Sequence, residues 1–270
     1  MDQCAFYPTV AELSGEHVWD RWLSKVYAKE VNLKKFRLVE YDSGGSELES
    51  KTTQQINRKA RVVCEPCNNG WMSVLTNETR SVAKDMIVRG SEIKLVPTDL
   101  STLAQFAFLK SVVIDHLAVG RQPFWPTSDR YAFRTKRLIP AGVQVWISSY
   151  FHTHAEGHVW SGYAQPKDAG FVGLEFHSFT YHTGCLVLQV MSKRWSKLSR
   201  RREVVPTFRQ NAYWDPVTVD IWPVYSLPIK WPLPKVLGPL VLSPQFRDRW
   251  LTLRTDRVPR SQRPKRDGFR

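Results

Sequence analysis

The stretch VVCEPCNNGWMSVL, residues 62–75, restricts the fold of this chain more than any other part of its sequence. A β-branched run ends in the pair Cys64 and Cys67, and an amphipathic pattern starts directly after it. Two thiols at this spacing form a turn, a knuckle, that can hold a metal ion from one side. The pattern predicts a strand that leads into a knuckle, followed by a helix over 68–88 that ends at Gly90.

Charge is the strongest global signal. The 270 residues include 39 Lys and Arg against 25 Asp and Glu, a formal net charge of +14. Such an excess attracts polyanions and indicates a nucleic-acid partner. Hydrophobic residues make up 42% of the chain, which excludes an intrinsically disordered protein.

The sequence contains no run near the roughly 20 apolar residues that a membrane-spanning helix needs. Its first residues, MDQCAFYPTVAELSG, lack the basic start and apolar run of a secretory signal. These features predict a cytoplasmic protein without a membrane partner. In a reducing compartment the four cysteines are expected to be thiols or metal ligands rather than disulfides.

The predicted fold class is α+β, in two parts. Residues 1–95 form the first part, with an exposed loop insertion near 40–57, and residues 96–253 form an accessory domain of helices on a mainly antiparallel sheet. Residues 254–270 are basic, contain prolines and lack apolar periodicity, which predicts a disordered tail. Helices are predicted over 17–31, 68–88, 98–120 and 127–137, and strands over 58–64, 143–151, 158–164, 173–182, 185–191 and 217–225.

A second motif, LSGEHVWDRWL, places Glu16 and His17 next to each other. A histidine can take a proton from water near neutral pH, and a carboxylate can hold a hard divalent cation. Asn68 offers a neutral oxygen to the same cation, and Glu and Asn together favour Mg²⁺ or Mn²⁺ over zinc. One cation and one base are sufficient for phosphodiester hydrolysis. Asn68 and Asn69 could instead cap the helix, as asparagine often does.

The combination LSGEHVW…RVVCEPCNNGWMSVL resembles the HNH (ββα-metal) endonucleases, over roughly residues 4–90. The resemblance implies that the first part is an HNH nuclease module that hydrolyses DNA, most readily double-stranded DNA. It also implies that His17 is the general base and that Glu16 and Asn68 are ligands of the catalytic cation. Because one such module cuts one strand, a homodimer is a further option.

The sequence departs from this family at two positions that matter for the site. Lys59 stands where the family has an asparagine that orients the base, so Lys59 is a candidate catalytic residue or phosphate contact. Asn57, two residues earlier, would point to the same face of a strand. Tyr7 stands where a second Cys pair would be completed, so a structural zinc would have three thiolates: Cys4, Cys64 and Cys67. Cys185, in an apolar strand, is expected to be an ordinary buried residue.

Basic side chains near the site are expected to bind phosphates without reading the base sequence. The candidates for nucleic-acid binding are Arg58, Arg61, Lys193, Arg194, Arg200, Arg201 and Arg202.

Two other functions compete with the nuclease. The chain could keep the scaffold and bind nucleic acid without catalysis, which Lys59 and Tyr7 favour. Alternatively, a metal-dependent hydrolase could use His152, His154 and His158 in FHTHAEGHVW, although the spacing is one residue longer than in metallo-hydrolase loops of the HxHxDH type.

Overall fold

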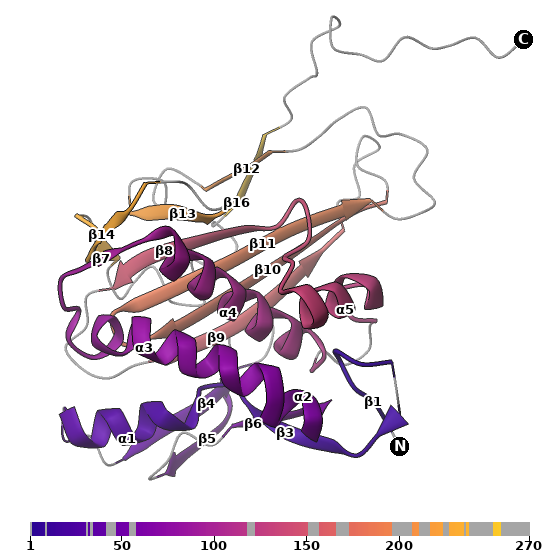
Figure 1. Cartoon of the computed structure of the whole chain (residues 1–270), viewed down its shortest axis with the longest axis horizontal. Coiled ribbons are helices and arrows are strands. Elements are labelled where there is room, and N and C mark those ends of the chain that lie inside the picture. Colours follow the sequence, from indigo (N-terminus) through magenta and orange to yellow (C-terminus); the bar gives the residue numbers. More distant parts are fainter. Residues whose placement is uncertain are drawn as a thin grey trace, which may run out of the picture.

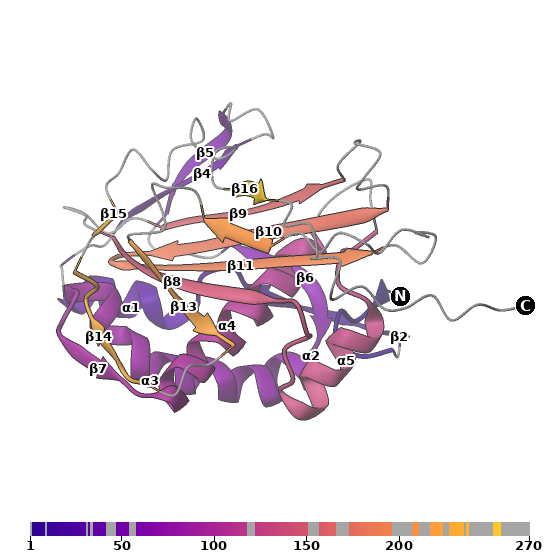
Figure 2. The same ribbon diagram turned by 90° about the horizontal axis from the view of Figure 1, so that it is seen from above.

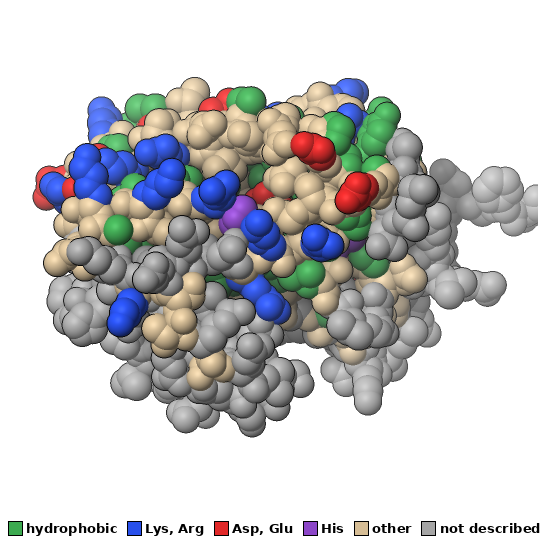
Figure 3. All heavy atoms as spheres, turned by 90° about the horizontal axis from the view of Figure 1, so that it is seen from below, with side chains coloured by type: hydrophobic (Ala, Val, Ile, Leu, Met, Phe, Trp, Pro, Cys, Tyr) green, Lys and Arg blue, Asp and Glu red, His purple; other side chains and the backbone are tan. Residues whose placement is uncertain are grey.

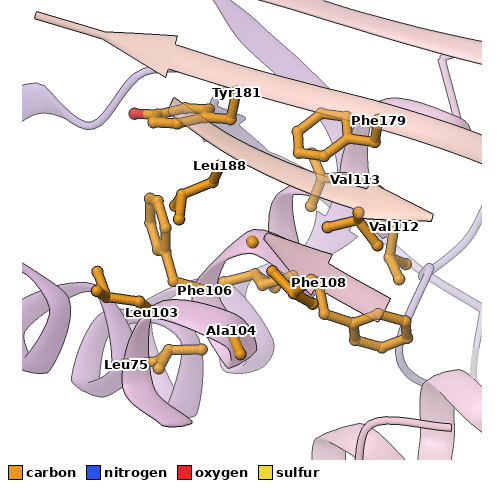
Figure 4. Close-up of a cluster of buried hydrophobic side chains, with 14 of the residues drawn as sticks. Leu75, Leu103, Ala104, Phe106, Phe108, Val112, Val113, Phe179, Tyr181 and Leu188 are labelled. Carbon is orange, nitrogen blue, oxygen red and sulfur yellow. The ribbon is translucent and has the colours of Figure 1, made fainter. Parts of the chain in front are cut away.

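Helix α4 (Pro97–Asp115) is apolar on nearly every side, and it therefore lies at the centre of the molecule. In the computed structural model it packs between α3 (Ser73–Arg89) and a six-stranded sheet. Figure 4 shows Leu103 and Phe106 of this helix between Leu75 of α3 and the sheet residues Tyr181 and Leu188. The structure describes residues 2–254 except 9, 31, 33–34, 42–46, 54–57, 118–121, 151–156, 166–172, 196–206, 211–216, 224–226, 235 and 238–250.

The sheet has the strand order β13-β8-β11-β10-β9, with β15 also paired to β8. All of these strands pair antiparallel except β15, so the expectation of a mainly antiparallel sheet is confirmed. Its helices lie on one face (Figure 2). The strands are β8 (Gln144–Tyr150), β9 (Gly157–Ala164), β10 (Leu174–Thr183), β11 (Leu186–Trp195), β13 (Thr218–Trp222) and β15 (Val236–Leu237).

Strand β3 (Leu13–His17) pairs antiparallel with β6 (Lys59–Cys64), and the chain then runs directly into α2 (Glu65–Cys67), the π-helical turn η1 (Asn68–Met72) and α3. The long helix ends at Gly90, as predicted, in a left-handed conformation. In Figure 1 the β3–β6 pair lies below α3. The β3–β6 pair thus leads into α3, while α1 and the strands β4 and β5 lie between β3 and β6 in the chain.

Two expectations for the first part are wrong. The segment expected to be an exposed loop near 40–57 contains an antiparallel hairpin, β4 (Phe36–Tyr41) with β5 (Glu47–Thr53). The helix expected over 17–31 begins only at Arg21, because His17 completes the ladder of β3; it is α1 (Arg21–Glu30). The apolar pattern continued through both elements, and periodicity alone does not separate a strand end from a helix start.

A tight hairpin joins β10 to β11 at the HTG turn that the sequence indicates. Gly184 has φ +55°, and a Cβ at this position would lie 2.1 Å from the carbonyl oxygen of Ile87. The next residue, Cys185, donates its backbone N–H to the same oxygen at 2.9 Å. Cys185 is half-buried in this turn rather than buried in a strand, so that expectation is corrected. The turn therefore anchors the sheet to the end of α3.

The remaining elements are short. They are β1 (Asp2–Gln3), β2 (Val10–Ala11), β7 (Ile93–Leu95), α5 (Thr127–Lys136), β12 (Thr207–Gln210), β14 (Ile229–Trp231) and β16 (Leu251–Arg254). The pairs are β1–β2, β7–β14 and β12–β16. Arg254, the first residue of the expected tail, ends β16, and 255–270 lie outside the described residues. Within the described ranges, we find no helix with the length and apolar character required to cross a bilayer.

One buried cluster includes residues from both predicted parts, among them Val63 and Leu75 from the first and Leu109 and Leu188 from the second. The boundary predicted near residue 95 falls between β7 and α4, so the two parts of the chain share this core.

Candidate functional site

The register of β3 and β6 places Glu16 and His17 on opposite faces of the pair. Glu16 is opposite Ala60, and His17 is opposite Lys59. Glu16 and Ala60 are buried, whereas Lys59 is exposed and His17 is half-exposed. A bulge between Ser14 and Gly15 sets this register. The candidate base therefore lies on the solvent side of the ladder, next to a lysine.

Lys59 also covers Gly15. A Cβ on Gly15 would lie 2.8 Å from Cδ of Lys59. The glycine thus leaves room for the alkyl stem of Lys59 to lie across β3. Asn57, the other residue considered for this role, lies outside the described residues.

Asn68 is held against β3 at the point where the knuckle becomes a helix. Its Nδ2 donates to Ser14 Oγ at 3.0 Å and to the carbonyl oxygen of Gly15 at 3.4 Å. Asn69 instead donates to Glu65 Oε1 at 3.1 Å, on the exposed side. Only the first of the two amides faces the strand that carries Glu16 and His17, and it is not used as a helix cap.

The pKa of His17 is lowered. Burial is the main cause; Lys59, Lys110 and Arg21 lower it further, and Glu16 opposes them. A neutral imidazole is the form that can accept a proton from water. The positive groups around His17 therefore favour its basic form and attract phosphate.

Sequence reasoning missed a buried lysine next to Glu16, His17 and Asp20, the group of residues called the His17 corner below. Nζ of Lys110, from α4, donates to Glu16 Oε1 at 2.6 Å, to the carbonyl oxygen of His17 at 2.7 Å and to Asp20 Oδ1 at 2.9 Å. Lys110 has no exposed surface. Burial lowers its pKa, but the charges of Asp20 and Glu16 outweigh this and raise it overall. A single lysine within the apolar run FAFLKSVV was the signal in the sequence.

Asp20 is the least satisfied member of this group. Burial raises its pKa although Lys110 acts in the opposite direction. Its Oδ2 is buried without a hydrogen-bond partner in the described part of the chain. Two carboxylates thus share one ammonium group in a site closed to water, where charges are costly unless they are paired.

The three cysteines Cys4, Cys64 and Cys67 meet in a second site. All are buried, and their sulfur atoms lie within 4.8 Å of one another. A hydrogen bond with Cys67 is the main cause that lowers the pKa of Cys4 to about 5, and the backbone N–H of Cys64 also donates to Cys4 Sγ, at 3.2 Å. The same contact, together with burial, raises the pKa of Cys67. This group could hold a metal ion, as expected.

Three thiols are the ligand type that a structural zinc site uses, so zinc is the ion expected at this group. Sulfur ligands on a tetrahedral zinc stand about 3.8 Å apart, from a Zn–S distance of about 2.3 Å. Tyr7, at the position where a fourth cysteine was considered, donates its backbone N–H to the carbonyl of Cys4. Its ring is stacked under the guanidinium of Arg134 at 4.2 Å. A fourth ligand would be water or a side chain other than a cysteine.

Zinc binding is tested by metal analysis. Protein purified from zinc-supplemented medium is expected to carry zinc, and Cys67→Ser is expected to lower the content at least about tenfold, because a thiolate ligand is lost. Cys185→Ser is the matched control and is expected to keep the wild-type content. Equal zinc contents in both variants, measured by inductively coupled plasma mass spectrometry, would argue against the three-cysteine site.

Of the candidate phosphate-binding residues, Lys59 and Arg61 are exposed on β6, and Arg58 is exposed directly before it. Arg21 and Lys25 of α1, which sequence reasoning did not select, are also exposed. Figure 3 shows Lys and Arg side chains gathered on the face seen from below Figure 1, around a histidine side chain. This face therefore presents cations together with an imidazole.

The other basic candidates do not lie beside His17 in the part of the chain that the structure describes. Lys193 and Arg194 lie on β11, in the middle of the sheet. Arg194 is bound to Glu175 and to the carbonyl of Phe124, and its guanidinium lies 4.6 Å over the ring of Phe124. Arg200, Arg201 and Arg202, and the histidines His152 and His154, lie outside the described residues; so does the side chain of His158.

No family model matches this chain, and neither a curated protein nor a solved structure is similar enough to match it.

Proposed function

We propose that this protein is a metal-dependent endonuclease that hydrolyses phosphodiester bonds in DNA, with His17 as the general base. The observation that carries the proposal is the contact between the Asn68 amide and β3 at Ser14 and Gly15. This contact joins the helix start to the strand that carries Glu16 and His17, with Lys59 beside His17. The arrangement of two strands and a helix is the one that the HNH resemblance implies.

Mg²⁺ or Mn²⁺ would be held by Glu16 and Asn68. Oε1 of Glu16 is bound to Lys110, whereas hydrogen bonds to Oε2, and to Oδ1 of Asn68, are absent among the described residues. Carboxylate and amide oxygens suit Mg²⁺, which in proteins is often completed by water and substrate phosphate. Glu16, however, is buried on the face of the β3–β6 pair opposite His17 and is bound to Lys110, so cation binding would require its carboxylate to turn toward the solvent side. When bound, the cation supplies positive charge that stabilises the transition state and the leaving oxygen.

The side chains of this chain perform the remaining steps. His17, kept neutral by its surroundings, takes the proton from the attacking water. Lys59 lies beside it and contacts the scissile phosphate, while Arg58 and Arg61 bind neighbouring phosphates of the duplex. Contacts of this kind weaken as the salt concentration rises.

The proposal is tested by nicking of supercoiled plasmid. The purified protein is expected to convert plasmid to open-circular or linear forms with millimolar Mg²⁺ or Mn²⁺ and to leave it intact in EDTA. Cleavage that is equally fast in EDTA would contradict a metal-dependent mechanism.

A second function has one observation in its favour. Because Lys110 already neutralises Glu16, the protein could bind DNA without holding a catalytic cation. Salt-sensitive DNA binding without cleavage in any divalent cation would select this function, as a nucleic-acid-binding protein on the same scaffold.

A further inference from the structure

The contacts of Lys110 all go to one short segment. Its three hydrogen-bond acceptors belong to Glu16, His17 and Asp20, at the end of β3 and in the turn before α1. An ammonium group has three N–H donors, so the three contacts use all of them. One acceptor is the backbone carbonyl of His17 itself. The lysine therefore holds the carbonyl end of the peptide that follows the candidate base, while the N–H end, on Val18, donates to the carbonyl of Arg58.

The support for this lysine is rigid. Lys110 extends from α4, whose neighbours Leu109 and Val112 are also fully buried. The ring of Phe106, one turn earlier, lies 5.3 Å from Nζ and adds a cation–π contact. A side chain on a packed helix holds its partners more accurately than one on a loop does.

The segment that Lys110 contacts is also held by the β3–β6 ladder and by contacts of the turn that follows it. Between β3 and α1, the backbone N–H of Val18 donates to Arg58 at 2.9 Å, and the indole of Trp19 donates to the carbonyl of His182 at 3.3 Å. The backbone carbonyl of Asp20 accepts a hydrogen bond from the N–H of Leu23 at 3.0 Å, at the start of α1. None of these contacts of the turn involves the side chain of Glu16 or the carbonyl of His17.

We propose that Lys110 is a positioning residue that holds the backbone at His17, and with it the imidazole, in the orientation required for catalysis. The catalytic role rests on the proposed function. The placement of His17 by Lys110 does not depend on it. Without Lys110, two buried carboxylates face each other without a counter-ion, and the segment 16–20 moves to bring them to water.

The placement is tested in metal-free protein by the NMR signals of the histidine rings. The His17 signal is identified by its loss in His17→Gln. In Lys110→Met this signal is expected to shift by more than its linewidth. Asp115→Asn is the matched control: Asp115 is equally buried on α4, and its Oδ1 lies 3.6 Å from Nε2 of His177. This control is expected to shift the His177 signal and to leave that of His17 unchanged.

A second variant covers the case in which Lys110→Met fails to fold. Lys110→Met combined with Asp20→Asn leaves one uncompensated carboxylate instead of two, and the same shift of the His17 signal is expected. If the folded variants keep the His17 signal within its wild-type linewidth, or if Asp115→Asn moves it as much, Lys110 does not position this residue.

Activity provides the second measurement. In plasmid nicking, Lys110→Met is expected to lower kcat at least about tenfold with an unchanged KM, because the exposed cations that bind DNA remain in place. A loss expressed mainly in KM would contradict the proposal. If the wild-type protein does not nick DNA but the His17 signal shifts as expected, the proposed function fails while the placement of His17 by Lys110 holds.

Discussion

Plasmid nicking by His17→Ala is expected to be about 10²- to 10⁴-fold slower than nicking by the wild-type protein, the usual contribution of a general base. His17 is half-exposed on the solvent side of β3, with a lowered pKa and a lysine opposite it. Initial rates of loss of supercoiled plasmid, at saturating Mg²⁺ and equal amounts of folded protein, measure the effect.

The control for this experiment is the double variant His152→Ala/His154→Ala. It is expected to nick at the wild-type rate, because the nuclease site uses neither histidine. If the double variant loses activity and His17→Ala keeps it, the hydrolase built on the FHTHAEGHVW segment is the correct interpretation and the nuclease assignment of His17 is wrong.

The free energy of unfolding of Lys110→Met is expected to be about 3–5 kcal/mol lower than that of the wild-type protein, because removing one partner of a buried ion pair leaves uncompensated charge. Lys110 has no exposed surface, and Glu16 and Asp20 are both buried beside it. Urea denaturation at pH 7, followed by far-ultraviolet circular dichroism, measures the difference.

Lys84→Met is the matched control for stability. Lys84 pairs with Glu30 at 3.6 Å, but its side chain is 38% exposed. Such a pair contributes about 0–1 kcal/mol, so this variant is expected to stay close to the wild type. Equal losses in Lys110→Met and Lys84→Met would show that the buried group does not stabilise the fold.

The local parts of the site could be predicted from the sequence because the chemistry of each lies within a few residues. The knuckle and the end of the helix at Gly90 follow from residue types at short spacing, whereas the helix start predicted at Asn68 is wrong: helical structure begins at Glu65, within the Cys pair, and α3 itself at Ser73. The meeting of Cys4 with Cys64 and Cys67 was also expected, from the number of ligands that zinc needs.

Lys110 could not be predicted, because its partners are 90 to 94 residues away in the chain. A lysine in an apolar helix shows that a buried partner must exist, but not which of the acidic residues provides it. The hairpin β4–β5 was missed for a different reason. Strand β5 is polar and follows the turn-forming segment YDSGGSE, so composition alone indicated a loop, whereas its backbone pairing with β4 stabilises a hairpin.

The dependence of the His17 corner on α4 has a consequence for the protein while it is being made. The ribosome completes residues 13–68, which include Glu16, His17, Lys59 and Asn68, well before α4 with Lys110 emerges. Until then Glu16 and Asp20 have no ammonium group to bind, and the corner is not organised. A nascent or prematurely terminated chain that ends before residue 110 therefore carries the motif residues without the ammonium group that pairs with Glu16 and Asp20.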